Sequence, residues 1–223
     1  MKIKRIILMV ALIISVASVQ AQKSQVIAHR GYWKTAGSAQ NSITSLQKAD
    51  SIHCYGSEFD VWLAKDNKLV VNHDPVYKMK YMEYSKGDAL TGLKLSNGEN
   101  LPSLQKYLEA GKKCNTKLIL ELKAHNSKKR ETKAVQEILA MVKKMGLEDR
   151  MEYITFSLHA MKEFIRLAPA GTPVFYLNGE LSPKELKDLG AAGLDYHMGV
   201  IKKHPEWIKE AHDLGLKVNV WTV

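Results

Sequence analysis

Acidic residues are absent from the first 21 positions of this chain, and three of the first five residues are cations. The apolar run Ile6–Val19 is shorter than the roughly 20 residues that a membrane-spanning helix needs. Because small residues end this segment, we expect residues 1–21 to be a secretory signal peptide cleaved after Ala21, with a retained N-terminal anchor as the alternative. No cysteine follows the run, which argues against a bacterial lipid anchor. The mature protein is therefore expected to be periplasmic or secreted, without stable membrane insertion.

Cysteine is scarce, since the chain contains only Cys54 and Cys114. Each lies a few residues before a predicted strand, and the two strands would be neighbours in a parallel barrel. Cys54 and Cys114 could therefore form a disulfide across the barrel floor or remain two buried free thiols. We favour free thiols.

Nucleic acid is not an expected partner, although the formal net charge is +10. The densest basic run, Lys128–Arg130, opens an amphipathic helix and has no nearby aromatic side chains on which bases could stack. The excess of positive charge either attracts small anions or only makes the surface basic and well solvated.

Residues 22–223 have the size of one domain, and strand and helix patterns alternate along them. Most strand candidates are short apolar runs, which is typical of strands covered on both faces. The predicted strands are Gln25–Ala28, Ser57–Leu63, Leu118–Leu122, Met151–Phe156, Val174–Leu177, Gly193–Tyr196 and Lys217–Trp221.

Serine caps, prolines and glycine stops place helices between the strands, and no repeat of 20 to 50 residues is visible. This alternation predicts an α/β fold with a parallel sheet. The predicted helices follow Ser103 as far as Gly111, span Glu131–Met145, follow Ser157 to before Pro169, begin at Pro183, and span Pro205–Leu214.

Two segments interrupt the alternation. A hairpin centred on Asp66-Asn67 would place His73 opposite Asp60. Residues 76–100 form a polar insertion rich in Gly, Lys and Tyr, which in a barrel would lie over the carboxyl ends of the strands.

Chemistry-bearing residues gather between positions 29 and 74, at or just after strand-like segments. They comprise His29-Arg30-Gly31, Glu58-x-Asp60 and Asn72-His73-Asp74. Metal-assisted chemistry on a phosphate ester needs this mixture, because carboxylates bind a hard cation, imidazoles transfer protons and a guanidinium binds phosphate.

These motifs resemble the glycerophosphodiester phosphodiesterase family in order and approximate spacing, from Ile27 to the C-terminus. The resemblance implies a TIM barrel, a divalent cation (usually Ca²⁺ or Mg²⁺), and cleavage of glycerophosphodiesters to glycerol 3-phosphate and an alcohol. The matching motifs are His29-Arg30-Gly31, Glu58-x-Asp60-Val61, Lys65-Asp66, Val70-Val71-x-His73-Asp74, Glu121-Leu122-Lys123 and Val220-Trp221-Thr222-Val223.

The resemblance assigns Glu58, Asp60 and Glu121 to the metal. Glu58 and Asp60 are two residues apart on one strand, so their side chains share a face. Glu121 lies in the apolar run Lys117–Leu122, where a charged group needs a partner.

His29 and His73 are the expected acid–base pair, without an assignment of which is the acid. Arg30 and Lys123 are expected to bind the non-bridging phosphate oxygens. The nucleophile is either water or the substrate's own glycerol hydroxyl, which would give a cyclic phosphate. Trp221 either packs against the glycerol portion or belongs to the core.

Two further histidines are weaker candidates for the site. His125 follows Lys123 closely, and His197 lies at a predicted strand end, where the catalytic groups of barrels collect.

The chain departs from the family pattern at two places. Ala39-Gln40-Asn41-Ser42 stands where the family usually has Pro-Glu-Asn-Thr, so Gln40 lacks a charge. Only seven of the family's eight barrel strands are found before Val223, so we expect a TIM barrel that is incomplete at the C-terminus, through truncation or imperfect closure.

The sequence thus predicts a metal-dependent glycerophosphodiester phosphodiesterase acting on a small-molecule substrate. A phospholipase D-like activity on lysophospholipid or sphingolipid is the enzymatic rival. A non-catalytic binder of phosphate esters is the alternative from another class.

Overall fold

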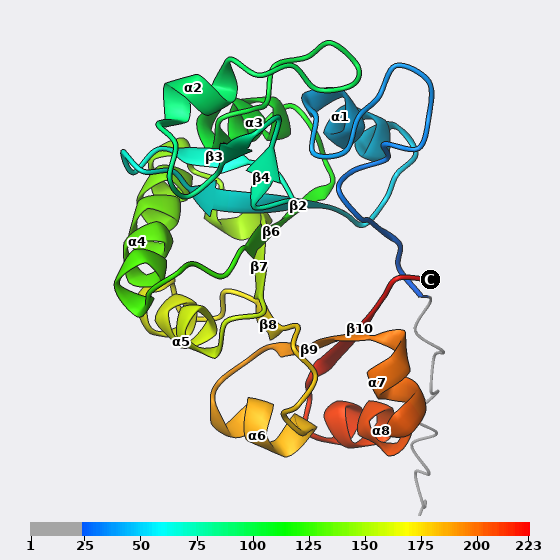
Figure 1. Ribbon diagram of the computed structural model, residues 1–223. Coiled ribbons are helices and arrows are strands. Elements are labelled where there is room, and N and C mark those ends of the chain that lie inside the picture. Colours follow the sequence, from blue (N-terminus) through cyan, green and yellow to red (C-terminus); the bar gives the residue numbers. More distant parts are fainter. Residues whose placement is uncertain (1–23) are drawn as a thin grey trace, which may run out of the picture.

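The computed structural model describes residues 24–223, and Figure 1 shows how their strands and helices are arranged. The signal peptide expected over residues 1–21 lies outside the described residues. The strands are β1 (Ile27–Ala28), β2 (Gly56–Leu63), β3 (Leu69–Val71), β4 (Val76–Tyr77), β5 (Lys80–Tyr81), β6 (Lys117–Leu122), β7 (Met151–Thr155), β8 (Val174–Tyr176), β9 (Gly193–His197) and β10 (Lys217–Trp221). The helices are α1 (Ile43–Ser51), α2 (Gly87–Thr91), α3 (Leu104–Gly111), α4 (Lys128–Met145), α5 (Leu158–Leu167), α6 (Pro183–Asp188), α7 (Met198–Lys203) and α8 (Glu206–Asp213), with a 3₁₀ turn at Glu148–Arg150.

Seven parallel strands form one curled sheet in the order β1-β2-β6-β7-β8-β9-β10, and β3 adds to β2 in the antiparallel direction (Figure 1). The predicted α/β class and the seven barrel strands are confirmed. Within the described residues β1 and β10 are not paired with each other, so the sheet is a curled part of a barrel.

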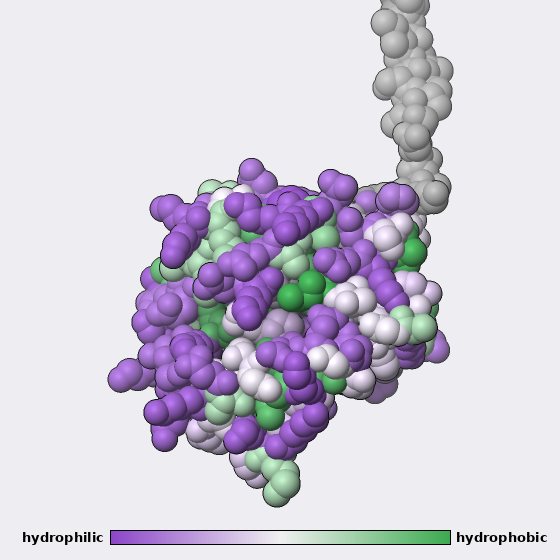
Figure 2. Space-filling view, turned by 90° about the horizontal axis from the view of Figure 1, so that it is seen from above, coloured by the Kyte–Doolittle hydropathy of each residue, from purple (hydrophilic) through white to green (hydrophobic). Residues whose placement is uncertain are grey.

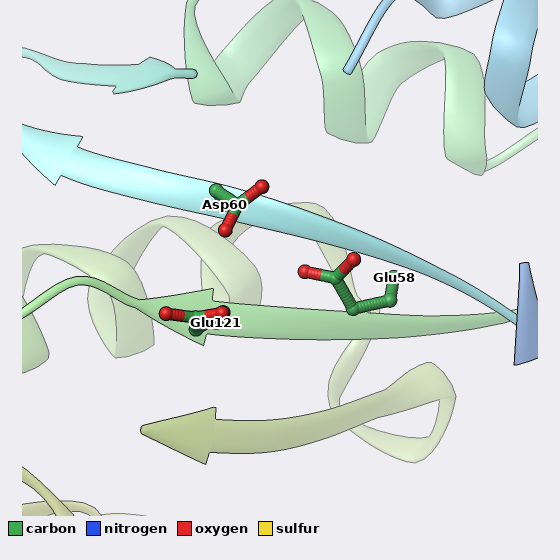
Figure 3. A group of neighbouring side chains, drawn as sticks. All are labelled: Glu58, Asp60 and Glu121. Carbon is green, nitrogen blue, oxygen red and sulfur yellow. The ribbon is translucent and has the colours of Figure 1, made fainter. Parts of the chain in front are cut away.

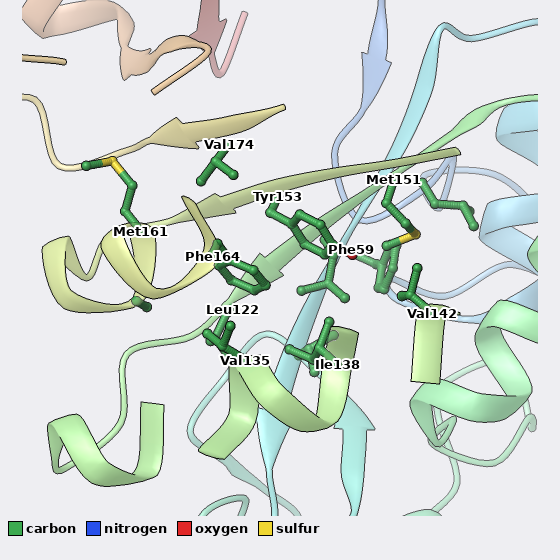
Figure 4. Close-up of a cluster of buried hydrophobic side chains, with 14 of the residues drawn as sticks. Phe59, Leu122, Val135, Ile138, Val142, Met151, Tyr153, Met161, Phe164 and Val174 are labelled. Atoms are coloured by element: carbon green, nitrogen blue, oxygen red, sulfur yellow. The ribbon is translucent and has the colours of Figure 1, made fainter. Parts of the chain in front are cut away.

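The outer face of the sheet packs against the helices and forms the main core (Figure 4). Alternate residues of β2, such as Phe59, point outward and are fully buried there. Aromatic pairs join the layers: Phe59 lies 4.3 Å from Tyr107, and Tyr153 lies 4.4 Å from Phe164, between ring centroids. This packing explains why β2 is buried along its whole length.

The inner face of the sheet carries a smaller apolar cluster of Ile119, Ile154, Phe175 and Leu177. Ile27 of β1 and Trp221 of β10 both pack against it from the two ends of the sheet. The polar residues of β2 and β6 share this inner face, because Glu121 is two positions from Ile119.

Serine residues cap the N-termini of three helices at the predicted positions. The hydroxyls of Ser103, Ser157 and Ser182 each accept a backbone N–H of the first turn. The helix expected from Glu131 begins three residues earlier, because Ser127 is the capping residue. The short helix α7 was not predicted, since a six-residue element with a glycine in its first turn carries almost no periodic signal.

The hairpin after β2 forms with a different register from the one predicted. Val61 pairs with Val71 and Leu63 with Leu69, and the Asn72 amide donates to the Asp60 carbonyl. Asn72 therefore lies opposite Asp60, and the expected pairing of His73 with Asp60 is wrong. The turn is centred on Asp66 alone, because the Ala64 amide bonds to the Lys68 carbonyl around three residues instead of two.

The segment 76–100 contains the β4–β5 hairpin and α2 and is tied to loops beside the carboxyl ends of the strands. The Lys65 amide donates to the Ser85 carbonyl just after β2. The Glu99 carboxylate accepts the Ile43 and Thr44 amides at the start of α1. The insertion therefore supports the loops that follow β1 and β2.

Hydrophilic side chains cover most of the face in Figure 2, and smaller apolar areas show between them in several places. None of the helices between residues 24 and 223 is long and apolar enough to cross a membrane. Cys54 and Cys114 are both free thiols.

Replacing Phe164 with alanine is expected to lower the free energy of unfolding by about 3–5 kcal/mol, because it empties a fully buried aromatic site. Urea unfolding followed by circular dichroism measures this loss. Ile208→Ala, at a side chain that is 37% exposed on α8, should cost under about 1 kcal/mol. Equal costs for the two variants would contradict the assignment of Phe164 to the core.

Candidate active site

Glu58, Asp60 and Glu121 meet on the inner face of the sheet (Figure 3). Glu58 and Asp60 share this face of β2, and the register of β2 with β6 places Asp60 beside Glu121. One carboxylate oxygen from each lies within 4.8 Å of the others, and all three residues are buried. The structure thus brings together the three residues that the sequence predicted as metal ligands.

Burial and mutual repulsion disfavour the charged forms of these carboxylates. Burial first, and then the Asp60 charge, hold the pKa of Glu58 well above its usual range. The same two causes raise the pKa of Glu121 to about 7. The group therefore needs positive charge nearby in order to stay ionised together.

Lys123 supplies part of that charge. Its ammonium lies 2.7 Å from Glu121 Oε1 and 3.2 Å from Asp60 Oδ1. Burial by itself would lower the pKa of Lys123, but the adjacent Asp60 and Glu121 outweigh burial and raise it. Lys123 is therefore cationic within the acidic group.

The three carboxylates fit a divalent cation. Oxygens within 4.8 Å of one another suit an ion that binds oxygen at about 2.0–2.6 Å. Glu58 Oε1 is also buried without a hydrogen-bond partner among the described residues. Such an oxygen is costly unless a cation or water binds it.

Arg30 borders the carboxylates from the loop after β1. Its backbone has a left-handed φ of 59°, which is costly for a residue other than glycine and aims its N–H at Glu58 Oε2, 2.8 Å away. Its Nη1 donates to Gln40 Oε1 at 2.8 Å, and its Nε lies 3.9 Å from Asp60 Oδ2. Gln40 thus orients the guanidinium through a neutral oxygen.

Asn41 holds Asp60 from both sides. Its Nδ2 donates to Asp60 Oδ2 at 2.8 Å, and its Oδ1 accepts the Asp60 backbone N–H at 3.1 Å. Asn41 is buried and has a φ of 61°, a conformation that asparagine tolerates better than most residues. Sequence reasoning placed Asn41 near the site but gave no sign of this two-point contact.

His29 lies beside the carboxylates, with Nε2 3.9 Å from Glu58 Oε2. Partial burial, followed by the charge of Arg30, lowers its pKa to about 4, and the nearby His73 contributes in the same direction. His73 Nδ1 lies 2.8 Å from Asp74 Oδ1. Both predicted acid–base residues therefore reach the same part of the molecule, although His73 is positioned by Asp74 and not by Asp60.

Trp221 lies at the end of β10 with its indole N–H donated to the Asp195 carbonyl at 2.9 Å. The edges of Phe156 and His197 approach its ring, at 5.7 and 5.0 Å between centroids. The His197 side chain also accepts the Gly199 amide at the start of α7. Trp221 is partly buried, so its two predicted roles, core packing and glycerol contact, are compatible with its position.

His125 is tied into the framework by both ring nitrogens. Nδ1 lies 2.7 Å from the Lys123 carbonyl, and Nε2 accepts the Leu63 amide at 2.9 Å. Burial lowers its pKa to about 4. These bonds join the ends of β2 and β6 and indicate a structural role.

Residues 29–223 match the model of the Glycerophosphoryl diester phosphodiesterase family. The chain belongs to this family. A glycerophosphodiester phosphodiesterase of Caldanaerobacter subterraneus subsp. tengcongensis is 26% identical over 216 residues, which cover 90% of this chain and 86% of that protein. The predicted family and enzyme class, a phosphoric diester hydrolase acting on glycerophosphodiesters, are confirmed.

Solved structures of similar proteins share the fold. A glycerophosphodiester phosphodiesterase from Parabacteroides distasonis has 55% identity and a TM-score of 0.88, over 89% of this chain and 84% of that one. An Oleispira antarctica phosphodiesterase, solved in complex with the product sn-glycerol-3-phosphate, has 23% identity and a TM-score of 0.75, over 90% and 85% of the two chains. The curled sheet is therefore the family's TIM-barrel architecture.

Adding Ca²⁺ or Mg²⁺ is expected to raise the melting temperature, because a cation offsets the repulsion within the acidic group. At 100 times the dissociation constant the rise should be about 5 °C or more. Differential scanning calorimetry measures it. Glu121→Gln should abolish the rise, whereas Glu109→Gln, an exposed control on α3, should retain it. An unchanged melting temperature at millimolar cation would count against the site.

Asn41→Gly should weaken binding of the cation by about 10-fold or more, because residues behind the metal ligands commonly contribute that much. Glycine tolerates the left-handed φ, so the variant removes only the side-chain contacts to Asp60. Calorimetric titration with Ca²⁺ gives the affinity. Asn67→Gly, at an exposed turn residue with a φ of 64°, is the matched control, and equal affinities in both variants would rule out the bracing role of Asn41.

Proposed function

We propose that this chain hydrolyses glycerophosphodiesters to glycerol 3-phosphate and an alcohol in a metal-dependent reaction. Glu58, Asp60 and Glu121 hold the divalent cation, Ca²⁺ or Mg²⁺. The bound cation supplies positive charge that polarises the phosphate. The observation that carries this proposal is the buried group of three carboxylates beside two cationic side chains and an imidazole. One Glu58 oxygen of this group has no hydrogen-bond partner among residues 24–223.

Arg30 and Lys123 bind the non-bridging phosphate oxygens in this proposal. The guanidinium is held by Gln40 on one side and approaches Asp60 with Nε on the other, so its orientation is set before substrate arrives. Lys123 is a point charge within the same group. Both cations offset the negative charge that the substrate brings to an acidic site.

His29 and His73 transfer protons to and from the reacting oxygens. One takes the proton of the attacking water or glycerol hydroxyl, and the other protonates the departing alkoxide. Partial burial and Arg30 favour the neutral form of His29, which has a nitrogen able to accept a proton. The Asp74 carboxylate orients the His73 ring.

The product-bound Oleispira antarctica phosphodiesterase supports a substrate of this class, since a protein of the same fold binds sn-glycerol-3-phosphate. We also propose that the protein is periplasmic or secreted, on the basis of the signal-peptide pattern of residues 1–21.

A phospholipase D-like activity on lysophospholipid is the second candidate. The observation in its favour is the exposed, partly apolar surface of the insertion, where Met79, Tyr81 and Tyr84 are 95%, 57% and 59% exposed. Comparing turnover of glycerophosphocholine with that of lysophosphatidylcholine separates the two activities. Binding of either compound without turnover would identify a non-catalytic binder.

His29→Ala and His73→Ala should each lower kcat by about 10²- to 10⁴-fold, as expected for the loss of a general acid or base. Release of glycerol 3-phosphate from glycerophosphocholine is the measurement. His212→Ala, at an exposed position on α8, is the matched control and should keep full activity. Full turnover in either site variant would eliminate that histidine as a proton-transfer group.

Removing divalent cations with a chelator should abolish the release of glycerol 3-phosphate, and adding Ca²⁺ or Mg²⁺ should restore it. The restored rate as a function of each ion identifies the preferred one. Activity that persists in chelator would refute the role of the three carboxylates as metal ligands.

A further inference from the structure

The β4–β5 hairpin presents an apolar tip to the solvent. Val76 pairs with Tyr81 and Tyr77 with Lys80, which leaves Lys78 and Met79 as the two turn residues. Met79 is 95% exposed, and Tyr81 and the nearby Tyr84 are more than half exposed, with ring centroids 6.2 Å apart. Such large apolar side chains are normally buried, so their gathering at one tip calls for a partner.

The tip is held in a strained conformation. Lys78 and Met79 have φ values of 45° and 62°, which a two-residue hairpin turn requires but which favour asparagine and glycine. The flanking residues enforce the turn: Met82 is fully buried, and the Tyr77 hydroxyl donates to the Lys94 carbonyl at 3.0 Å. The hairpin therefore holds Met79 in the solvent in a conformation that is costly for methionine and that no apolar burial offsets.

Positive charge surrounds the tip. Residues 74–94 include four exposed lysines, and within the described residues none has a carboxylate within ion-pair distance. The lysines are Lys78, Lys80, Lys86 and Lys94.

The three acidic side chains of residues 74–94 all have partners inside the protein. Asp74 bonds to His73, and Asp88 pairs with Lys68. Glu83 accepts the Asn126 amide and lies 3.9 Å from Arg130 Nε. Glu83 and Asp88 therefore face cations of the protein itself, which leaves the four exposed lysines in excess over Asp74.

The hairpin also lies next to the active site. Val76 follows His73 by three residues, and the Tyr84 hydroxyl accepts a hydrogen bond from Asn126, three residues after Lys123. Figure 1 shows β4 beside β3, whose chain leads directly to His73. The hairpin is therefore linked to the site both through the chain that leads from His73 and through the loop that follows Lys123.

We propose that the β4–β5 hairpin is an anchor for the surface of an anionic lipid bilayer. Met79 enters the boundary between headgroups and acyl chains, and Tyr81 and Tyr84 lie at the headgroup level that tyrosine prefers. The four lysines attract the anionic headgroups. A bilayer fits better than an acidic protein or nucleic acid, because an exposed methionine at the turn of a hairpin suits insertion among lipids. The two tyrosine rings are tilted by 59° to each other, so they do not form a flat surface on which bases could stack.

Sedimentation with vesicles tests this anchor. The protein should partition onto vesicles of phosphatidylcholine and phosphatidylglycerol in equal amounts, and about 100-fold less or lower onto phosphatidylcholine alone, because all four lysines then lose their anionic partners. Lys78→Gln with Lys80→Gln should lower partition onto the mixed vesicles by about 25-fold, since each lysine contributes about fivefold. Met79→Ser should lower it by about 10-fold through the lost apolar contact.

Matched variants on other exposed surfaces control for charge and apolarity. Lys143→Gln with Lys144→Gln, at the end of α4, removes the same charge, and Ile52→Ser, at the end of α1, removes an exposed apolar side chain. Both controls should sediment like the unmodified protein. Equal losses in tip and control variants, or no partition onto the mixed vesicles at low salt, would overturn the anchor.

Two further measurements separate the anchor from other roles. The tip variants should keep kcat/KM on soluble glycerophosphocholine, and a loss there would make the hairpin part of the substrate site instead. Sedimentation equilibrium should show the same mass for the protein and Met79→Ser, and a dimer that this variant abolishes would assign the tip to a second copy. Vesicle binding needs no turnover, so it is independent of the proposed function.

Discussion

Repulsion among three buried carboxylates is the constraint on which the rest of the site depends. Two unit charges within 4.8 Å repel by about 3 kcal/mol or more at an effective dielectric constant of 20. The β2–β6 pairing places Asp60 next to Glu121, so the sheet cannot form without bringing these charges together. Lys123 and Arg30 reduce the cost, and a divalent cation would reduce it further.

The loops after β1 hold the site in a shape that the strands alone would not provide. Arg30 and Asn41 both have left-handed backbones, and each uses that conformation to contact a carboxylate. The left-handed conformation costs about 1 kcal/mol or more at each position, and buried hydrogen bonds offset this cost. Glu99 of the insertion caps α1 directly after this loop, so the insertion contributes to the geometry of the site.

Local patterns predicted most of the elements because hydrophobic period and capping chemistry act over a few residues. The seven parallel strands and the helices behind Ser103, Ser157 and Ser182 formed as expected. The predicted hairpin register was wrong by one residue. The polar residues Lys65 to Lys68 are compatible with a turn of either two or three residues, and the structure has three. That single difference exchanged Asn72 for His73 opposite Asp60.

The sequence by itself determined the fold class, the family motifs and the shared face of Glu58 and Asp60, since these follow from residue type and the two-residue period of a strand. Only the tertiary structure decided that Asn41 hydrogen-bonds to Asp60 and that Gln40 accepts a hydrogen bond from the Arg30 guanidinium. It alone decided which apolar residues of the insertion are buried and which, like Met79, are exposed. These features depend on contacts between segments that meet only when the sheet curls, and no local pattern encodes them.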